Sequence, residues 1–174
     1  DIIEPGDGDF VRVFIGMRRG GSNFYAVDVT PDDSCTLPSK ICPKYMWQIK
    51  GGVPGTDFYK LAQTWSTPRV TKIHQGTTGT SSEAKAVLIF GGGYYPTQDS
   101  GWGPDEITTP PENVGKGVGT GNAIFIVDPA DGSRLWWASA PGSGATLELA
   151  NMNFSIPSDV AFLDANGDGE TDRL

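Results

Sequence analysis

Short apolar runs separated by polar turns set the pattern of this chain. The runs are five to seven residues long, rich in β-branched and aromatic side chains, and bounded by Gly, Pro, Asn or Asp, which is typical of β-strands. They predict strands over residues 10–15, 23–29, 45–49, 69–73, 86–90, 123–127, 134–138 and 159–163. No long amphipathic helix is predicted, and only residues 144–151 are compatible with one or two helical turns. The chain is therefore predicted to be all-β.

Two segments repeat the same order of strands. The first copy has an apolar strand that runs into glycines, an Asn-led strand that closes on Asp28, a Trp-bearing strand and a Ser-x-Pro step. The second copy has these features in the same order and closes its Asn-led strand on Asp128. The segments concerned are residues 13–21, 23–28, 47 and 66–68 in the first copy and 87–93, 122–128, 136–137 and 155–157 in the second. Repeated four-stranded antiparallel units of this kind are typical of the blades of a β-propeller.

The spacing of the copies defines the predicted organisation. Asp28 and Asp128 are 100 residues apart, about twice a blade of ~40 to 50 residues, and insertions at residues 31–44 and 94–121 account for the excess. We predict that residues 1–174 are a partial β-propeller with about two four-stranded antiparallel blades. The blade-like units cover about 10–65 and 66–154, and residues 155–174 hold the opening strand of a third blade and its loop. Such a piece cannot close a ring alone.

Charge and hydropathy exclude two classes of partner. The net charge of −8 and a pI of about 4.5 lack the basic footprint that phosphate backbones attract, so we expect no nucleic acid. No apolar stretch approaches the ~20 residues that cross a bilayer, so we expect no membrane span. The N-terminus also lacks the features of a signal peptide, and a secreted protein would therefore appear here as a mature fragment.

The two cysteines, Cys35 and Cys42, lie in a loop-like stretch with nearby prolines. Their spacing is not Cys-x-x-Cys and no histidine partners are evident, which argues against a zinc site or a redox centre. We predict a disulfide between them, which would indicate an oxidising compartment such as the periplasm or the cell surface. The alternative is two free thiols in a cytosolic protein.

The C-terminal run 164–172, called the aspartate loop below, carries the clearest chemistry. Oxygen-bearing side chains stand at its positions 1, 3, 5 and 9 and a glycine at position 6, which is the spacing of a calcium loop. The predicted ligands are the side chains of Asp164, Asn166, Asp168 and Asp172 and the backbone carbonyl of Glu170. A plain hairpin turn is the alternative, since Asn-Gly and Asp-Gly favour hairpins. Three aspartates within nine residues repel one another, however, and this favours a bound Ca²⁺.

The single histidine, His74, follows a strand and has no serine, cysteine or second histidine as an evident partner in the sequence. Catalysis through it would need such a partner. We therefore expect His74 to be a solvated turn residue.

Five blocks of the sequence resemble PilY1-type type IV pilus biogenesis and adhesion factors. In order along the chain they are residues 16–30, 63–68, 88–94, 121–128 and 155–160, the last leading into the aspartate loop. The resemblance implies a modified, PQQ-dehydrogenase-like propeller with calcium on the same loop residues. It also implies export through the periplasm to the bacterial surface or the pilus (fimbrium), and a role in pilus extension and retraction, twitching motility and adhesion. Minor pilins at the pilus tip are the implied partners, with a host-cell or abiotic surface as a possible target.

Two other functions compete with this interpretation. An FG-GAP-type adhesion propeller would explain the aspartate loop but not the Trp-bearing repeats. A quinoprotein dehydrogenase would need a cofactor at the propeller axis, and the adjacent cysteine pair often stacked on that quinone is missing. The chain also has no Arg-Gly-Asp tripeptide, so the resemblance does not support integrin binding by that route. The sequence favours a calcium-controlled interaction protein that is not an enzyme.

Overall fold

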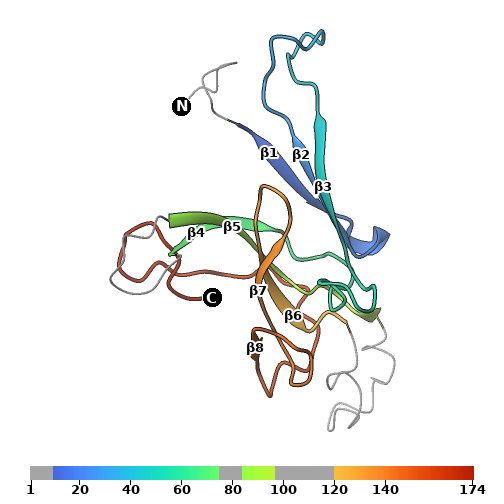
Figure 1. The fold of residues 1–174 in the computed structure, drawn as a ribbon, viewed down its shortest axis with the longest axis vertical. Coiled ribbons are helices and arrows are strands. Elements are labelled where there is room, and N and C mark those ends of the chain that lie inside the picture. The colour runs from blue at the N-terminus through green and yellow to red at the C-terminus, as the bar shows by residue number, and fades with distance from the viewer. Residues whose placement is uncertain (1–9, 75–83, 97–119) are drawn as a thin grey trace.

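The computed structural model describes residues 10–74, 84–96 and 120–174 and has an all-β fold, which confirms the predicted class (Figure 1). The strands form two sheets, one in the order β1-β2-β3 and one in the order β4-β5-β6-β7-β8. All neighbouring strands are antiparallel except β7 and β8, which are parallel. The elements are β1 (Arg12–Gly16), the short 3-10 helix η1 (Arg18–Gly20), β2 (Asn23–Asp28), β3 (Lys44–Lys50), β4 (Arg69–His74), β5 (Ala84–Gly91), β6 (Ala123–Val127), β7 (Arg134–Ser139) and β8 (Leu147–Glu148).

Seven of the eight predicted strands are present, with ends that differ by at most two residues. The eighth, over residues 159–163, is not a strand; only Leu163 at its end forms an isolated bridge, to Arg173. Its apolar residue Val160 is instead buried against the second sheet. The helical turns considered for residues 144–151 are also absent, because this segment pairs with β7 and forms β8. In both places tertiary packing overrides the local preference of the sequence.

The two sheets share one pairing register. The equivalent pairs are Val13–Val27 with Leu88–Val127, Gly16–Phe24 with Gly91–Ile124, and Ala26–Trp47 with Ile126–Trp136. A β-bulge follows Ala26 in the first sheet and Ile126 in the second, directly after these equivalent pairs. Strands β1, β2 and β3 therefore correspond residue by residue to β5, β6 and β7. The second sheet adds β4, so that β4 to β7 make a four-stranded antiparallel meander. The first unit was predicted to be four-stranded, but among the described residues its sheet has three strands. The described strands close neither a barrel nor a ring.

The register also defines two faces on each sheet, here called face A and face B, and each face has its equivalent on the other sheet. Face A carries Phe14, Phe24, Ala26 and Trp47 in the first sheet and their equivalents Ile89, Ile124, Ile126 and Trp136 in the second. Face B carries Val13, Ile15, Tyr25 and Val27 in the first sheet and Leu88, Phe90, Phe125 and Val127 in the second. The sequence repeat thus has a structural meaning, since each unit presents the same two surfaces.

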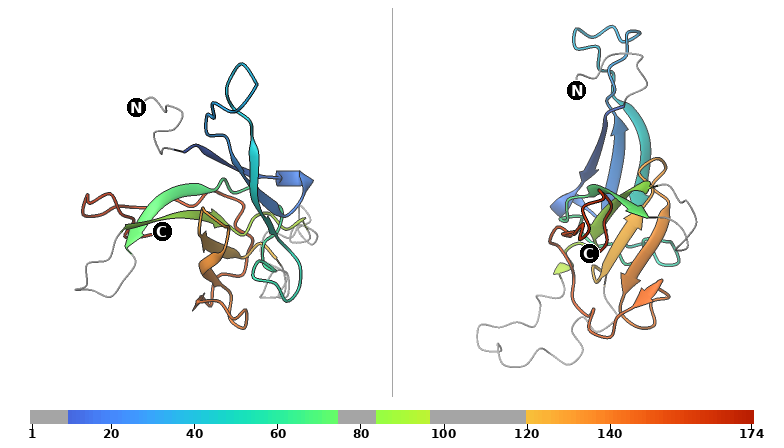
Figure 2. Two further views of the ribbon diagram at one scale, coloured as in Figure 1. Left: turned by 45° about the horizontal axis from the view of Figure 1, so that its top comes forward. Right: turned by 90° about the vertical axis from the view of Figure 1, so that its left-hand side faces the viewer.

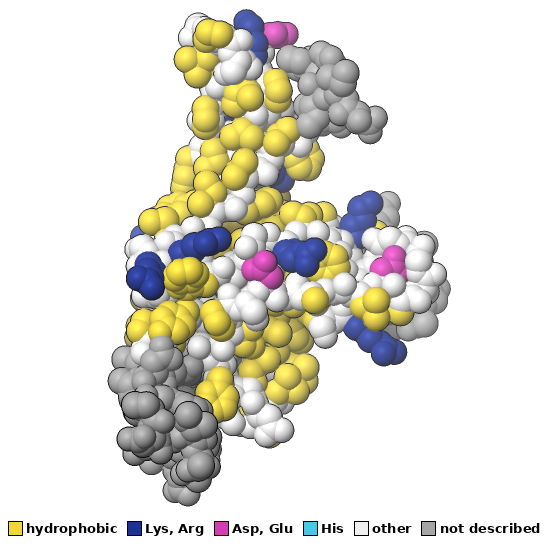
Figure 3. Space-filling model, turned by 180° about the vertical axis from the view of Figure 1, so that it is seen from behind, with side chains coloured by type: hydrophobic (Ala, Val, Ile, Leu, Met, Phe, Trp, Pro, Cys, Tyr) yellow, Lys and Arg dark blue, Asp and Glu magenta, His cyan; other side chains and the backbone are white. Residues whose placement is uncertain are grey.

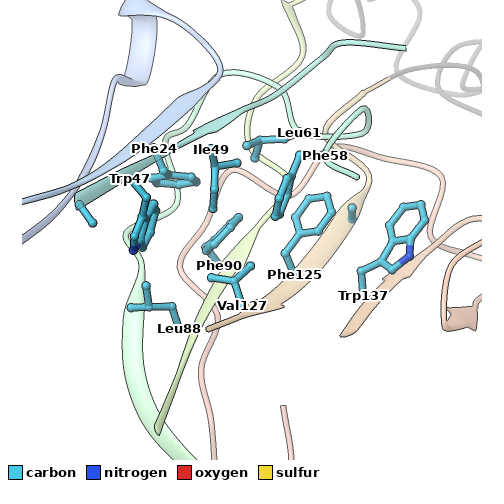
Figure 4. Packing of buried hydrophobic residues seen from close by; sticks show 12 residues of the cluster. Phe24, Trp47, Ile49, Phe58, Leu61, Leu88, Phe90, Phe125, Val127 and Trp137 are labelled. Atoms are coloured by element: carbon cyan, nitrogen blue, oxygen red, sulfur yellow. The ribbon is translucent and has the colours of Figure 1, made fainter. Parts of the chain in front are cut away.

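The main core lies where face A of the first sheet packs on face B of the second (Figure 4). The rings of Phe24 and Phe90 are 4.5 Å apart between centroids, and Phe90 in turn contacts Phe125 at 5.7 Å. Trp47 reaches across the interface, where its indole Nε1 donates to the carbonyl oxygen of Pro129 at 3.1 Å. Buried apolar area of this kind is the dominant stabilising term in folding. The two units are therefore stacked head to tail, through unlike faces.

The two outer faces of the stacked sheets are covered to different extents. Face A of the second sheet packs against Val160 of the C-terminal segment. Face B of the first sheet has no such cover among the described residues, and its Ile15 is 46% exposed. Hydrophobic side chains gather over the arm that β1 to β3 form, as Figure 3 shows. A sheet face with several exposed apolar side chains is unusual on a solvated surface.

Candidate calcium-binding loop

A short antiparallel closure defines the aspartate loop. The backbone amide of Leu163 donates to the carbonyl oxygen of Arg173 at 2.9 Å, and the amide of Arg173 returns a hydrogen bond to Leu163 at 3.2 Å. Between these ends the chain turns sharply at Gly167 and Gly169, which have φ angles of 80° and 86°. Glycine adopts positive φ without the Cβ clash of other residues. Residues 164–172 therefore form a closed loop with two glycine bends.

Asp164 organises the inside of the loop. Its Oδ1 accepts a hydrogen bond from the amide of Gly167 at 2.6 Å, and its Oδ2 accepts one from the amide of Gly169 at 2.8 Å. The amides of Gly169 and Gly167 hold the pKa of the Asp164 carboxyl below its ordinary value. Asp164 is therefore a permanently charged group at neutral pH, fixed at the first position of the loop.

The other predicted ligands also contact backbone amides or one another. Asp172 accepts a hydrogen bond from the amide of Ala165 at 2.8 Å. Asp168 accepts one from the amide of Glu170 at 2.8 Å and one from the side-chain amide of Asn166 at 2.9 Å. Within the described ranges no three side chains of His, Cys, Asp or Glu gather closely enough to hold a metal ion. The loop thus brings the predicted residues onto one small turn, with their carboxylates directed to hydrogen-bond donors of the loop.

Strand β4 fixes the loop to the second sheet. The amide of Thr171 donates to the carbonyl oxygen of Lys72 at 2.7 Å, and the hydroxyls of Thr71 and Thr171 are 2.6 Å apart. His74, the last residue of β4, places its Nδ1 3.2 Å from Oε2 of Glu170. His74 is exposed, as expected, but it ends a strand instead of lying in a turn. Its partner lies 96 residues away in sequence, which no local pattern could have indicated.

The donor set agrees in kind with the predicted cation. Asp164, Asn166, Asp168 and Asp172 supply hard oxygen atoms on an exposed turn, and calcium requires such oxygens. Each carboxylate oxygen has two lone pairs, so a hydrogen bond from an amide leaves one for a second partner. The carboxylate of Glu170 is directed to His74, which leaves its backbone carbonyl as its donor. Binding would require the aspartate side chains to turn toward a common centre.

The second predicted pair, Cys35 and Cys42, forms a disulfide in the long loop between β2 and β3, with Cα atoms 5.7 Å apart. This loop extends from the end of the first sheet that is remote from the second sheet (Figures 1 and 2). A bridge between Pro31 and Ile41 and an ion pair of 2.9 Å between Asp32 and Lys44 close the loop at its base. The cross-link therefore belongs to a hairpin loop that already has backbone pairing.

Two further findings do not concern a single site. No helix among the described residues is long and apolar enough to cross a membrane. Comparisons with protein-family models, with curated proteins and with solved structures give no match.

Proposed function

We propose that this chain is part of a calcium-binding β-propeller of a PilY1-type protein. The protein acts in pilus extension and retraction, in twitching motility and in surface adhesion, as a binding protein and not as an enzyme. The observation that carries the proposal is the aspartate loop, which is closed by the pairing of Leu163 with Arg173 and anchored on β4. Its partners are minor pilins at the pilus tip.

The head-to-tail packing of the sheets supports the propeller. Interfaces between unlike faces of a repeated unit generate closed rings or open arrays, and propellers are rings of four-stranded sheets. In this chain face A of one sheet covers face B of the next. The exposed face B of the first sheet, with Val13 and Ile15, is the surface that a further unit of the ring covers. Val160 begins the corresponding cover on the second sheet.

In this proposal calcium fixes the aspartate loop and, through it, strand β4. A cation shared by the aspartate side chains removes their mutual repulsion, which otherwise only the loop amides offset. Because Thr171 and Glu170 contact β4, order in the loop is passed directly to the second sheet. A ligand at 100 times its dissociation constant stabilises the folded state by about 2.7 kcal/mol. That amount is large beside the net stability of a domain.

The Cys35–Cys42 disulfide supports export. Disulfides persist in the periplasm and at the cell surface and are rare in the cytosol. The protein in this proposal passes through the periplasm and functions at the bacterial surface, on the type IV pilus.

Calorimetric titration with CaCl₂ tests the proposal. The full chain is compared with an Asp164→Ala, Asp168→Ala double variant and with Asp131→Ala as the matched control. Asp131 lies in the β6–β7 turn and also accepts a local backbone hydrogen bond, from Ser133 at 2.8 Å. We expect saturable binding and a calcium-dependent rise in melting temperature for wild type and for the control, and neither for the double variant.

Two results would overturn the calcium site: no binding by wild type, or equal binding by the double variant. The pilus role is tested separately in a piliated bacterium that produces the same variants in the parent protein. Calcium-dependent twitching should be lost with the double variant and kept with Asp131→Ala. Normal twitching in both would leave a calcium-binding protein without the proposed pilus role.

A further inference from the structure

A pocket opens at the ends of β1 and β5, beside the C-terminal segment. Its volume is about 540 Å³, and its lining includes Arg18, Arg19, Trp65, Tyr94 and Asp159. Arg18 and Arg19 follow β1, and Tyr94 follows β5 at the equivalent place in the second unit. The pocket thus lies on the seam between the two repeated units, where loops on a rigid scaffold usually carry binding sites.

Arg18 has a backbone conformation that is unfavourable for its residue type. Its φ angle is 48°, in the left-handed region that non-glycine residues rarely adopt. The amide of Arg18 is held by the carbonyl oxygen of Thr64 at 3.2 Å. The equivalent residue in the second unit is Gly93, whose amide makes the equivalent bond to Ile156 at 2.9 Å with a φ of 90°. The fold therefore requires positive φ here, and the first unit places an arginine where the second has glycine.

The charged groups of the pocket are available to a ligand. The guanidinium groups of Arg18 and Arg19 lie over the ring of Trp65 in long cation–π contacts, with 5.7 Å and 6.0 Å between the guanidinium carbon and the ring centroid, and this contact leaves their N–H groups for a ligand. Among the residues that the structure describes, neither guanidinium forms a hydrogen bond or an ion pair. Asp159 uses Oδ1 to accept the amide of Thr67 at 2.6 Å, which leaves Oδ2 for another donor. Two cations, an indole face and a carboxylate oxygen therefore line one cavity.

We propose that this pocket binds an anionic sugar. The carboxylate or phosphate of the sugar pairs with Arg18 and Arg19, since guanidinium groups match these anions with paired hydrogen bonds. The C–H face of the sugar ring packs on the half-buried indole of Trp65, and its hydroxyls donate to Asp159. A bare anion would use only the arginines, and a neutral sugar would leave them without a counter-charge. Backbone strain retained at Arg18 agrees with a binding role. The pocket shares no residue with the aspartate loop, so this inference goes beyond the proposed function.

Titration of the full chain with four small probes tests the inference, followed by calorimetry and by tryptophan fluorescence. The probes are glucuronate, glucose 6-phosphate, glucose and acetate. We expect saturable binding of glucuronate, of glucose 6-phosphate or of both. Glucose should bind at least about tenfold more weakly because it lacks the charge-assisted hydrogen bonds, which contribute roughly that factor. Acetate should also bind more weakly, because it lacks the ring that packs on Trp65. The tighter of the two charged sugars identifies the anionic group as carboxylate or phosphate. Failure of both charged sugars to bind, or equal binding of acetate, overturns the inference.

Three variants locate the site. Arg18→Gln should weaken binding of the charged sugar about tenfold or more, while Lys50→Gln, which removes an exposed cation of the first sheet outside the pocket, should not. Arg18→Gly should lose affinity equally without a lower melting temperature, because glycine adopts positive φ freely. Loss of binding with intact stability assigns the effect to the guanidinium. Unchanged affinity in both Arg18 variants would overturn the assignment.

Discussion

The head-to-tail packing of the sheets predicts a large effect for Trp47 and a smaller one for its repeat equivalent, Trp136. Trp47 is 8% exposed, because the second sheet covers it. Its ring stacks on Phe14 at 5.7 Å between centroids, and its Nε1 donates to Pro129. Trp136 occupies the same register position and is only half-buried, since the cover over its face is incomplete.

The magnitudes follow from this burial. Replacing a buried tryptophan by alanine costs about 3–5 kcal/mol through lost transfer energy and the cavity left behind. We expect this cost for Trp47→Ala. For Trp136→Ala we expect about half of it, in proportion to its burial. At about 2–4 °C per kcal/mol for a chain of this length, the melting temperature should fall by about 6–20 °C for Trp47→Ala.

Urea unfolding followed by circular dichroism measures both changes without relying on the fluorescence that the substitutions remove. The free energy of unfolding is extrapolated to water, and an unchanged slope shows that the unfolded state is comparable. Trp47→Phe keeps a ring and loses the bond to Pro129, so it gives an intermediate value if Trp47→Ala does not fold. A cost for Trp136→Ala equal to or above that for Trp47→Ala would refute the assignment of face A of the first sheet as the buried interface.

Three further outcomes are expected. The double variant Cys35→Ser, Cys42→Ser should lower the free energy of unfolding by about 2–3 kcal/mol in the chain-entropy model, and reductant should lower it in wild type but not in the variant. Two amides of the preceding turn hold the pKa of Glu148 below its ordinary 4.5. Its stabilising contribution is therefore complete above pH 4.5 and is lost as the pH falls through the lower folded pKa. In acid titrations, the stability of Glu148→Gln should fall less steeply with pH than that of wild type. An identical pH profile of stability would contradict this. Gly93→Ala should lower the melting temperature more than Gly142→Ala. Both glycines have positive φ, but only at Gly93 would the added Cβ overlap a backbone carbonyl oxygen, so equal effects would argue against close packing there.

The strands and their repetition could be predicted because both depend on local pattern. Apolar runs between turn residues located seven strands, and the Asp-terminated strand with a following Trp revealed the repeat. The alignment was wrong by one residue at Asn23, which the sequence matched with Asn122. The pairing register matches Asn23 with Ala123 instead. Register depends on the partner strand and on the bulge, and neither is visible in a single run of residues.

The candidate site also has features that the sequence could predict and features that it could not. The spacing of oxygen-bearing residues predicted a calcium loop with a sharp bend at Gly169. A closed loop with bends at Gly167 and Gly169 is present between Leu163 and Arg173, and calcium binding by it stays a prediction. The directions of its carboxylates, the contact with β4 and the contact of His74 with Glu170 could not be predicted. These depend on how a segment near residue 170 docks on a strand near residue 72, and only the assembled sheet determines that docking.

The difference between Arg18 and Gly93 indicates how a repeated scaffold acquires a site. Both positions need positive φ because both follow a strand whose next turn is anchored on the neighbouring segment. Glycine meets this need at Gly93, where a backbone carbonyl leaves no room for a side chain. At Arg18 there is room, since the side chain opens into the pocket beside Trp65. Selection for folding alone would favour glycine at both positions. The first unit departs from the repeat at Arg18, at a conformational cost. Ligand binding is therefore the expected reason for the arginine at this position.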